Sequence, residues 1–77
     1  MVDSSRPDLK RLGGELRARR LSQGLSLRTV AARAGWHRSV VEAVERGDPT
    51  HLLALVDVAA VLGTRVQVVC QGYELAV

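Results

Sequence analysis

The feature that most constrains this chain is a pair of short helical patterns that meet at Gly35, within residues 26–47. The first begins after Ser26, a residue type that often caps a helix N-terminus, and the second ends at Gly47. Because glycine adopts the left-handed conformation that ends a helix tightly, each pattern is expected to form a separate helix. The apolar positions at helical spacing are Leu27, Val30, Ala31 and Ala34 before the glycine, and Val40, Val41 and Val44 after it. Valines are poor helix formers, so packing must hold the second helix in place.

Further elements are expected on both sides of this pair. Helical spacing predicts four helices in all, at residues 8–22, 26–34, 37–46 and 51–62. After Gly63 the spacing changes to alternation, which predicts a β-strand over residues 64–71. We therefore expect a flexible N-terminal arm at 1–7, one helical domain at 8–63, the strand at 64–71 and a loose tail at 72–77.

The helix expected at 51–62 is apolar on every side, with Asp57 as its only charged residue after His51. A helix of this kind must be covered on every side. One face can pack in the domain's own core through Leu52, Leu55, Val58, Ala59 and Leu62. The outward face comprises Leu53, Val56, Ala60 and Val61. In a chain of 77 residues, we expect a second copy of the chain to cover this face.

The strand expected at 64–71 has no partner strand in an otherwise helical chain. Val66, Val68 and Cys70 share one of its faces. An open strand edge is a pairing site, so we expect the same strand of a second subunit to pair with it. The expected dimer interface therefore comprises Leu53, Val56, Ala60, Val66, Val68 and Cys70. A symmetric interface can bring two copies of Cys70 together as a disulfide, but we favour the role of a small buried apolar side chain.

Composition excludes several classes of protein. The single cysteine excludes an internal disulfide and a Cys-rich zinc site, and it fits a reducing cytoplasm. No apolar run reaches the ~18 residues of a membrane span, and residues 1–7 lack the core of a signal peptide. His37, His51 and Cys70 lack the spacing of metal ligands, and no glycine-rich phosphate loop or paired carboxylates accompany them. We therefore expect a cytoplasmic protein that has no contact with membranes, is not an enzyme and holds no metal or cofactor.

Charge is distributed unevenly along the chain. Residues 1–47 carry ten basic and five acidic side chains, whereas residues 48–77 carry one basic and three acidic side chains. The basic half coincides with the two helices around Gly35, and basic asymmetry of this kind suits a phosphate backbone. The alternative is an arginine-rich surface that reflects the base composition of the source genome. A pair of helices at a tight turn can present its second helix to the major groove of DNA, which favours the first interpretation.

An ordered set of residues from about 12 to 63 resembles the phage-repressor-like (Xre/Cro) helix-turn-helix family. The set is Leu12-Gly13, Leu16-Arg17, Arg20, Gly24-Leu25-Ser26, Val30-Ala31, Gly35, Val41, Val44-Glu45-Arg46-Gly47, Leu55, Val58-Ala59 and Leu62-Gly63. In that family an arginine late in the first helix pairs with the glutamate that ends the third. The resemblance therefore implies an ion pair between Arg20 and Glu45, which would orient the third helix. The alternative for Glu45 is a solvated surface charge.

The resemblance places base-contacting positions on the third helix, at Arg38, Ser39, Glu42 and Ala43. Arginine can donate two hydrogen bonds to guanine, so Arg38 is the first candidate, with a phosphate contact as the alternative. Glu42 can accept from a cytosine amino group, but its spacing of four residues from Arg38 and Arg46 favours pairing on the helix surface. Ala43 can contact a thymine methyl group or leave space for the DNA.

Two positions depart from the family's phosphate-binding pattern. Leu27 stands where the family usually has a phosphate-binding glutamine, so Arg28 is expected to take over that contact. His37 stands at a cap position that is usually serine or threonine, where it either reaches a phosphate or is merely exposed. Trp36 either packs against the core or contacts the sugar-phosphate backbone. The expected phosphate contacts are Arg28, His37, Arg46 and Arg6.

The strand that follows Leu62-Gly63 makes the chain similar to the HipB-type antitoxins, whose strands pair across a dimer axis. The resemblance implies a mainly α fold, a four-helix repressor-like domain with a C-terminal β-strand that pairs across a dimer. The implied function is that of a dimeric repressor that binds a pseudo-palindrome in double-stranded DNA. The alternative is an antitoxin that neutralises a kinase-type toxin by direct binding and represses its own operon.

Overall fold

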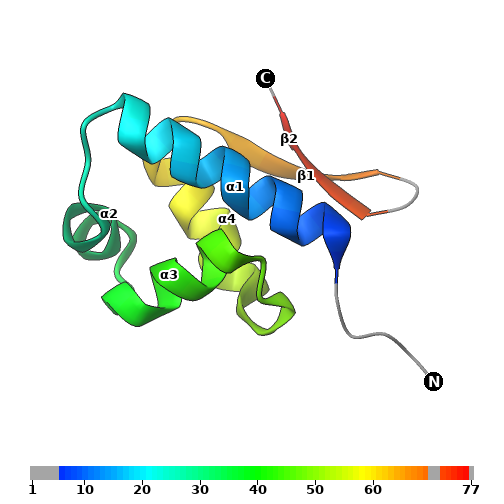
Figure 1. Cartoon of the computed structure of the whole chain (residues 1–77), viewed down its shortest axis with the longest axis horizontal. Coiled ribbons are helices and arrows are strands. Elements are labelled where there is room, and N and C mark those ends of the chain that lie inside the picture. Colours follow the sequence, from blue (N-terminus) through cyan, green and yellow to red (C-terminus); the bar gives the residue numbers. More distant parts are fainter. Residues whose placement is uncertain (1–5, 70–71, 77) are drawn as a thin grey trace.

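The computed structural model describes residues 6–69 and 72–76. Its elements are α1 (Pro7–Ser22), α2 (Leu27–Ala34), α3 (Arg38–Arg46), the 3₁₀ turn η1 (Pro49–His51), α4 (Leu52–Val61), β1 (Arg65–Val69) and β2 (Gly72–Ala76), as Figure 1 shows. The four expected helices are confirmed, and each of their ends lies within one residue of the predicted position. The fold is therefore mainly helical, with two strands at the C-terminal end.

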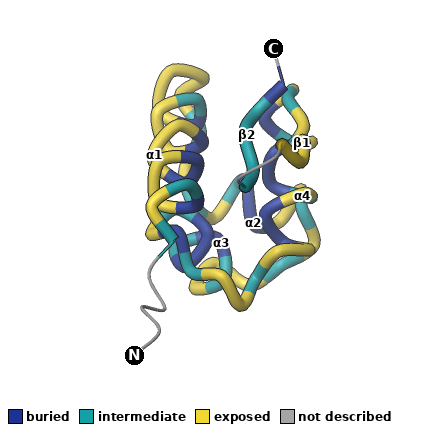
Figure 2. Tube along the Cα trace, turned by 90° about the vertical axis from the view of Figure 1, so that its right-hand side faces the viewer, coloured by how far each residue is buried: buried dark blue, intermediate teal, exposed yellow. Residues whose placement is uncertain are grey.

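Apolar side chains from all four helices meet in one core, and Figure 2 shows the buried parts of the trace on the inner sides of the helices. The fully enclosed members include Leu12, Leu16, Val30, Val41, Ala54, Val58 and Ala59. On α4 the predicted core face is correct except at Leu52, which is 38% exposed while Ala54 is buried instead. At 100° per residue, position 52 lies about a quarter turn away from the centre of the buried face. The helix nevertheless keeps an outward apolar face.

The prediction of a loose tail at 72–77 is wrong for residues 72–76. These residues form β2, which pairs antiparallel with β1 in a two-stranded sheet, with Val66 opposite Leu75. The first partner of β1 is thus a strand of its own chain, and β2 packs against α1. Two hydrogen bonds to residues outside the sheet hold β2 in place: the Tyr73 N–H donates to Asp8 Oδ2 of α1 at 3.2 Å, and Oγ1 of Thr64, just before β1, donates to the Ala76 carbonyl at 2.7 Å.

The hairpin also changes the expected dimer surface. Val66, opposite Leu75 of β2, packs against the helical core and is half-buried, so only part of its side chain is available to a second copy. Val68 is 79% exposed near the end of the hairpin. Cys70, which was expected at the same interface, lies outside the described residues. Within the described ranges, no helix has both the length and the apolar character needed to cross a membrane.

Candidate nucleic-acid interface

Local backbone chemistry builds the turn between α2 and α3. Ser26 caps α2 as predicted, because its hydroxyl oxygen accepts a hydrogen bond of 3.1 Å from the Thr29 N–H. Gly35 then ends α2 in the left-handed conformation at φ 77°. His37 caps α3: its Nδ1 accepts from the Ser39 N–H at 3.1 Å and lies 2.8 Å from the Ser39 hydroxyl. Nδ1 of His37 is thus occupied by the cap, and a phosphate contact through the rest of this exposed ring stays a prediction.

A buried ion pair fastens the C-terminal end of α3 to α1, as the resemblance implied. Arg20 Nε donates to Glu45 Oε2 at 2.7 Å and Arg20 Nη2 donates to Glu45 Oε1 at 3.2 Å, while both side chains are less than a tenth exposed. Arg20 Nη1 also donates to the Leu25 carbonyl at 3.0 Å. The hydrogen bonds to Glu45 raise the pKa of the Arg20 guanidinium above its ordinary value. Fork-like pairing of this kind fixes direction, so it orients α3 on α1.

Two glycines allow the backbones of α1 and α3 to approach each other at this end. A Cβ on Gly13 of α1 would lie 2.7 Å from the Glu45 carbonyl oxygen, and closer still to that of Val44. Gly47, at φ 83°, ends α3 beside Lys10, whose Cα would lie 2.6 Å from an added Cβ. Side chains at either position would force the two helices apart. The C-terminal half of α3 is therefore rigidly placed.

The N-terminal half of α3 presents polar side chains outward. Arg38 and Ser39 are exposed, and Glu42 is half-buried. Arg38 Nε lies 3.7 Å from Glu42 Oε1, so the predicted pairing of Glu42 on the helix surface is confirmed, with Arg38 as the partner. Both side chains of this pair are more than 40% exposed, so the pair contributes little to stability.

Ala43 does not belong to this exposed face. It is only 4% exposed, because the chain after α3 folds back on the helix, where the Asp48 N–H donates to the Ala43 carbonyl at 3.0 Å and η1 packs against α3. The expected contact of Ala43 with a thymine methyl group is therefore wrong for the protein in this conformation. Its small side chain lets the chain pack closely around it.

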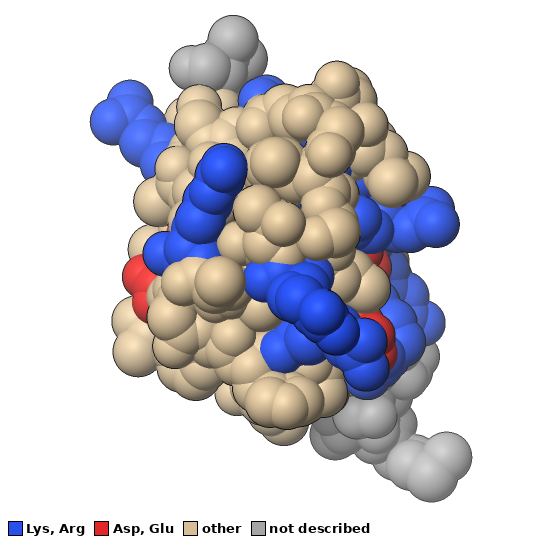
Figure 3. All heavy atoms as spheres, turned by 90° about the vertical axis from the view of Figure 1, so that its left-hand side faces the viewer, with Lys and Arg blue, Asp and Glu red and all other residues tan. Residues whose placement is uncertain are grey.

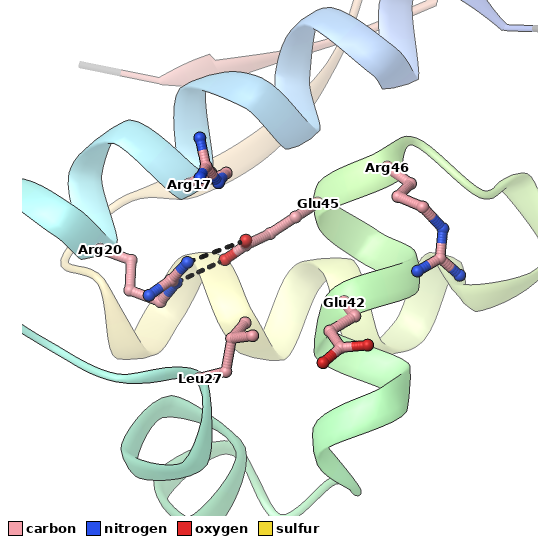
Figure 4. A pocket seen from close by; sticks show the side chains of 6 residues that line it. All are labelled: Arg17, Arg20, Leu27, Glu42, Glu45 and Arg46. Atoms are coloured by element: carbon pink, nitrogen blue, oxygen red, sulfur yellow. Dashed lines mark hydrogen bonds and ion pairs between the residues drawn. The ribbon is translucent and has the colours of Figure 1, made fainter.

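A hollow of about 340 Å³ lies beside the buried ion pair. Its lining residues are Arg17, Arg20, Leu27, Glu42, Glu45 and Arg46. Figure 4 shows Arg17 projecting from α1 and Arg46 from α3 around the Arg20–Glu45 pair. Arg17 was missed as a site residue, although its spacing of three residues from Arg20 places both on one side of α1. Three arginines against two glutamates leave this hollow with an excess of positive charge.

The other two arginines expected to contact phosphates, Arg28 and Arg6, lie in different surroundings. Arg28 is exposed in the first turn of α2, where a phosphate can also meet the N-terminus of the helix. Arg6, in contrast, is occupied: its Nε and Nη2 donate to Asp8 at 3.1 and 2.9 Å, and its guanidinium lies 5.7 Å from the centroid of the Tyr73 ring. These bonds lower the pKa of the Asp8 carboxyl, with the Arg6 hydrogen bond as the largest cause. We call the contacts among Arg6, Asp8 and Tyr73 the hairpin anchor. A phosphate contact of Arg6, which would have to replace its bonds to Asp8, stays a prediction.

The charged surface agrees with this arrangement. Figure 3, viewed from the side on which α2 lies, shows Lys and Arg side chains crossing this face, with acidic groups at its margins. Exposed arginines of the two central helices are Arg28, Arg33, Arg38 and Arg46. The exposed part of the α2–α3 unit is therefore predominantly basic.

Trp36 was expected to pack in the core or to contact DNA, and the structure shows packing together with a hydrogen bond. The ring is half-buried and packs against the core. Its indole Nε1 donates to Asp57 Oδ2 of α4 at 2.8 Å. The acidic residue on an otherwise apolar helix was visible in the sequence, but its partner 21 residues earlier was not.

In residues 6–69 and 72–76, no group of three or more His, Cys, Asp or Glu side chains is placed so that it could hold a metal ion. No curated protein and no solved structure is significantly similar to the chain. A family model described as a helix-turn-helix domain, in contrast, matches residues 11–69, which include all four helices apart from the first turn of α1 and all of β1. The chain therefore belongs to the helix-turn-helix domain family of DNA-binding proteins.

Proposed function

We propose that this protein is a sequence-specific transcriptional regulator, a dimeric repressor that binds a pseudo-palindromic operator in double-stranded DNA with α3 in the major groove. The observation that carries the proposal is the division of α3 into two faces. Val41 and Val44 are buried in the core, whereas Arg38 and Ser39 are exposed next to the turn. The major groove is wide enough for an α-helix and displays a distinct pattern of donors and acceptors at each base pair.

Arg38 is the side chain that we assign to base contact. Its guanidinium can donate two hydrogen bonds to N7 and O6 of one guanine, which discriminates this base from the other three. In the free protein it lies beside Glu42, but an exposed pair at 3.7 Å is weak and can be exchanged for a bidentate contact with DNA. Ser39 can donate to or accept from a neighbouring base edge.

Arginines around α3 provide the phosphate contacts in this proposal. Arg28 lies at the start of α2, and Arg46 is the last residue of α3, the helix proposed to enter the groove. Arg17 borders the same hollow as Arg46. Phosphate contacts carry no base preference, but they set the position and orientation of a protein on the duplex. They also make binding depend strongly on salt, because each neutralised phosphate releases counterions.

Dimerisation is supported by two surfaces. Leu53 is 68% and Val56 49% exposed on the outward face of α4, together with the exposed Ala60. The edge of β1 that faces away from β2 forms no backbone hydrogen bond within the described part of the chain. Exposed apolar faces and open strand edges are both typical of contacts between copies. A symmetric dimer places two recognition helices about 34 Å apart, one turn of the DNA helix.

The same exposed face of α4 favours a second candidate function, that of an antitoxin which neutralises a kinase-type toxin by direct binding and represses its own operon. An apolar helix face can bind another protein as well as a second copy. Stoichiometric co-purification with the co-expressed product of the neighbouring gene, abolished by Leu53→Glu, would support this function.

The proposed function can be tested by selecting bound fragments from a pool of random duplex DNA. We expect a pseudo-palindrome whose half-sites are separated by about one helical turn, or about 10 base pairs. The logarithm of the binding constant should fall steeply with the logarithm of the salt concentration, by about 0.9 per phosphate contact. Recovery of no preferred sequence would refute specific binding, and recovery of a single half-site by a chain that sediments as a monomer would refute the dimer.

The variant Arg38→Ala tests the assigned base contact. We expect it to lose about 1–3 kcal/mol on the selected duplex and to lose discrimination at one base position. Arg11→Ala is a matched control, because Arg11 is also exposed but lies on α1, where its Nη2 reaches the Tyr73 carbonyl of the hairpin. Equal losses of Arg38→Ala on all sequences would show that Arg38 contacts only the DNA backbone.

A further inference from the structure

In addition to the apolar core, and within the described part of the chain, two hydrogen-bonded side-chain contacts to other helices fix α3 and the turn before it, one near each end of α3. At the C-terminal end, Glu45 is bound to Arg20 of α1. At the N-terminal end, the turn that leads into α3 is bound to α4, because the Trp36 indole N–H donates to Asp57 Oδ2 at 2.8 Å. The first contact belongs to the general framework of the domain, whereas the second involves the turn itself.

The chemistry of the second contact makes it directional. A carboxylate that accepts from an N–H forms a shorter and stronger bond than a neutral acceptor does. Asp57 is the only charged residue of α4, and among the described residues Trp36 is the one hydrogen-bond partner of its side chain. Both side chains are half-buried, so water competes only partly for this bond. The position of the carboxylate on α4 therefore determines where the indole ring, and with it the turn, can lie.

The α2–α3 turn also determines where the exposed N-terminal end of α3 lies. Arg38 and Ser39 follow Trp36 by two and three residues in the sequence. His37, which lies between Trp36 and Arg38, is the N-terminal cap of α3. A nine-residue helix is about 13 Å long, so a rotation of about 5° around its fixed C-terminal end displaces its N-terminal end by about 1 Å. Bidentate hydrogen bonds to a base tolerate little displacement, because their strength falls steeply with distance and angle.

We propose that Trp36 and Asp57 are positioning residues for DNA recognition: their hydrogen bond fixes the α2–α3 turn on α4 and so sets the placement of Arg38 and Ser39 in the groove. Neither residue contacts the bases in this proposal. It rests on the proposed function, because it assigns the placement of α3 in the same DNA site. It also connects α4, whose outward face is offered for the second copy, with the end of the helix that contacts the bases.

The test compares specific and non-specific binding in four single variants of the full chain and in the double variant Trp36→Phe, Asp57→Ala. Asp57→Ala removes the acceptor, Trp36→Phe removes the donor but keeps an aromatic ring, and Asp57→Asn keeps an acceptor oxygen while removing the same charge as Asp57→Ala. Gln23→Ala is the matched control, because Gln23 Nε2 donates to the Leu62 carbonyl at 3.0 Å and so ties α1 to the end of α4 without involving the turn. Binding is measured to the duplex selected by the wild-type chain and to an unrelated duplex. The temperature is kept well below the unfolding midpoint of the least stable variant.

We expect Asp57→Ala and Trp36→Phe each to reduce the ratio of specific to non-specific affinity by about tenfold, equivalent to about 1.4 kcal/mol. The double variant should have the same affinity ratio as either single variant, since both substitutions remove the same hydrogen bond. Asp57→Asn should retain most of the wild-type ratio, and Gln23→Ala all of it.

Two results would overturn the inference, and they differ from failure of the proposed function. If Asp57→Ala and Trp36→Phe lower the unfolding midpoint but leave the affinity ratio unchanged, the bond is only structural. If Asp57→Asn loses as much of the ratio as Asp57→Ala while Trp36→Phe keeps the wild-type ratio, the charge of Asp57 matters rather than the bond to Trp36. If the wild-type chain selects no duplex at all, the proposed function fails, and the inference fails with it.

Discussion

Adjacent glycines in α1 offer a stringent test of how closely α1 and α3 pack. In the middle of a helix, replacing glycine with alanine normally stabilises a protein by about 0.5–1 kcal/mol, because alanine loses less conformational freedom on folding. Gly14 is exposed, and an added Cβ would meet nothing within 4 Å, so Gly14→Ala should show this full gain. Gly13 is buried one residue earlier in the same helix, so its intrinsic preference is the same.

At Gly13 the packing reverses the sign. An added Cβ would lie 2.7 Å from the Glu45 carbonyl oxygen and 2.9 Å from the Glu45 carbonyl carbon. These obstacles are backbone atoms of α3, which cannot rotate away as a side chain can, so α3 has to shift. Forcing an extra methyl group into a well-packed site costs about 1–3 kcal/mol, from which the intrinsic gain is subtracted. We expect Gly13→Ala to lose about 1–2 kcal/mol net, a difference of about 1.5–3 kcal/mol from Gly14→Ala.

Thermal unfolding followed by circular dichroism at one fixed protein concentration measures this difference. For a domain of this size, 1 kcal/mol corresponds to about 4–8 °C in the unfolding midpoint, so the midpoints of the two variants should differ by about 6–24 °C. A fixed concentration is needed because the proposed dimerisation would also affect the midpoint. If Gly13→Ala were as stable as Gly14→Ala, the close approach of α1 and α3 would be refuted.

Two other predictions concern the buried ion pair and the hairpin anchor. Glu45→Gln leaves the buried Arg20 guanidinium without a charged partner, so urea unfolding should show a loss of about 3–5 kcal/mol in the free energy of unfolding. The double variant Arg20→Met, Glu45→Leu should recover most of this loss. A Glu45→Gln variant as stable as the wild type would contradict the burial of the pair. Because Arg6 lowers the pKa of Asp8 in the folded state, the contribution of Asp8 is present above the ordinary carboxyl pKa of about 4 and is lost as the pH falls below it. The stability gap between wild type and Asp8→Asn, measured by thermal unfolding, should therefore narrow from about pH 6 to about pH 3, and a gap independent of pH would be evidence against the anchor.

The helical part of the fold could be predicted because its signals are local. Ser26, Gly35 and Gly47 act on the backbone within a few residues of their own positions, so their roles follow from residue type and spacing. The Arg20–Glu45 pair is not local, and it was predicted only through the resemblance to a family with the same pair.

The parts that could not be predicted depend on contacts between distant segments. Residues 72–76 have only a weak strand pattern, and they become β2 because β1, α1 and Asp8 surround them. Helical spacing places Ala43 beside Ser39, but only the return of the chain after Gly47 buries it. Trp36 shows its hydrogen bond only when α4 is placed next to the turn.

The hydrogen bond between the Tyr73 N–H and Asp8 joins residues that are 65 positions apart. Contacts of such sequence separation form late in folding, since nearly the whole chain must be ordered before they can repay the entropy of closure. On the ribosome, α1 emerges early and has no hairpin to pack against until residues 72–76 have been synthesised. The docking of the hairpin on α1 is therefore the step that completes the fold after the helical core has formed.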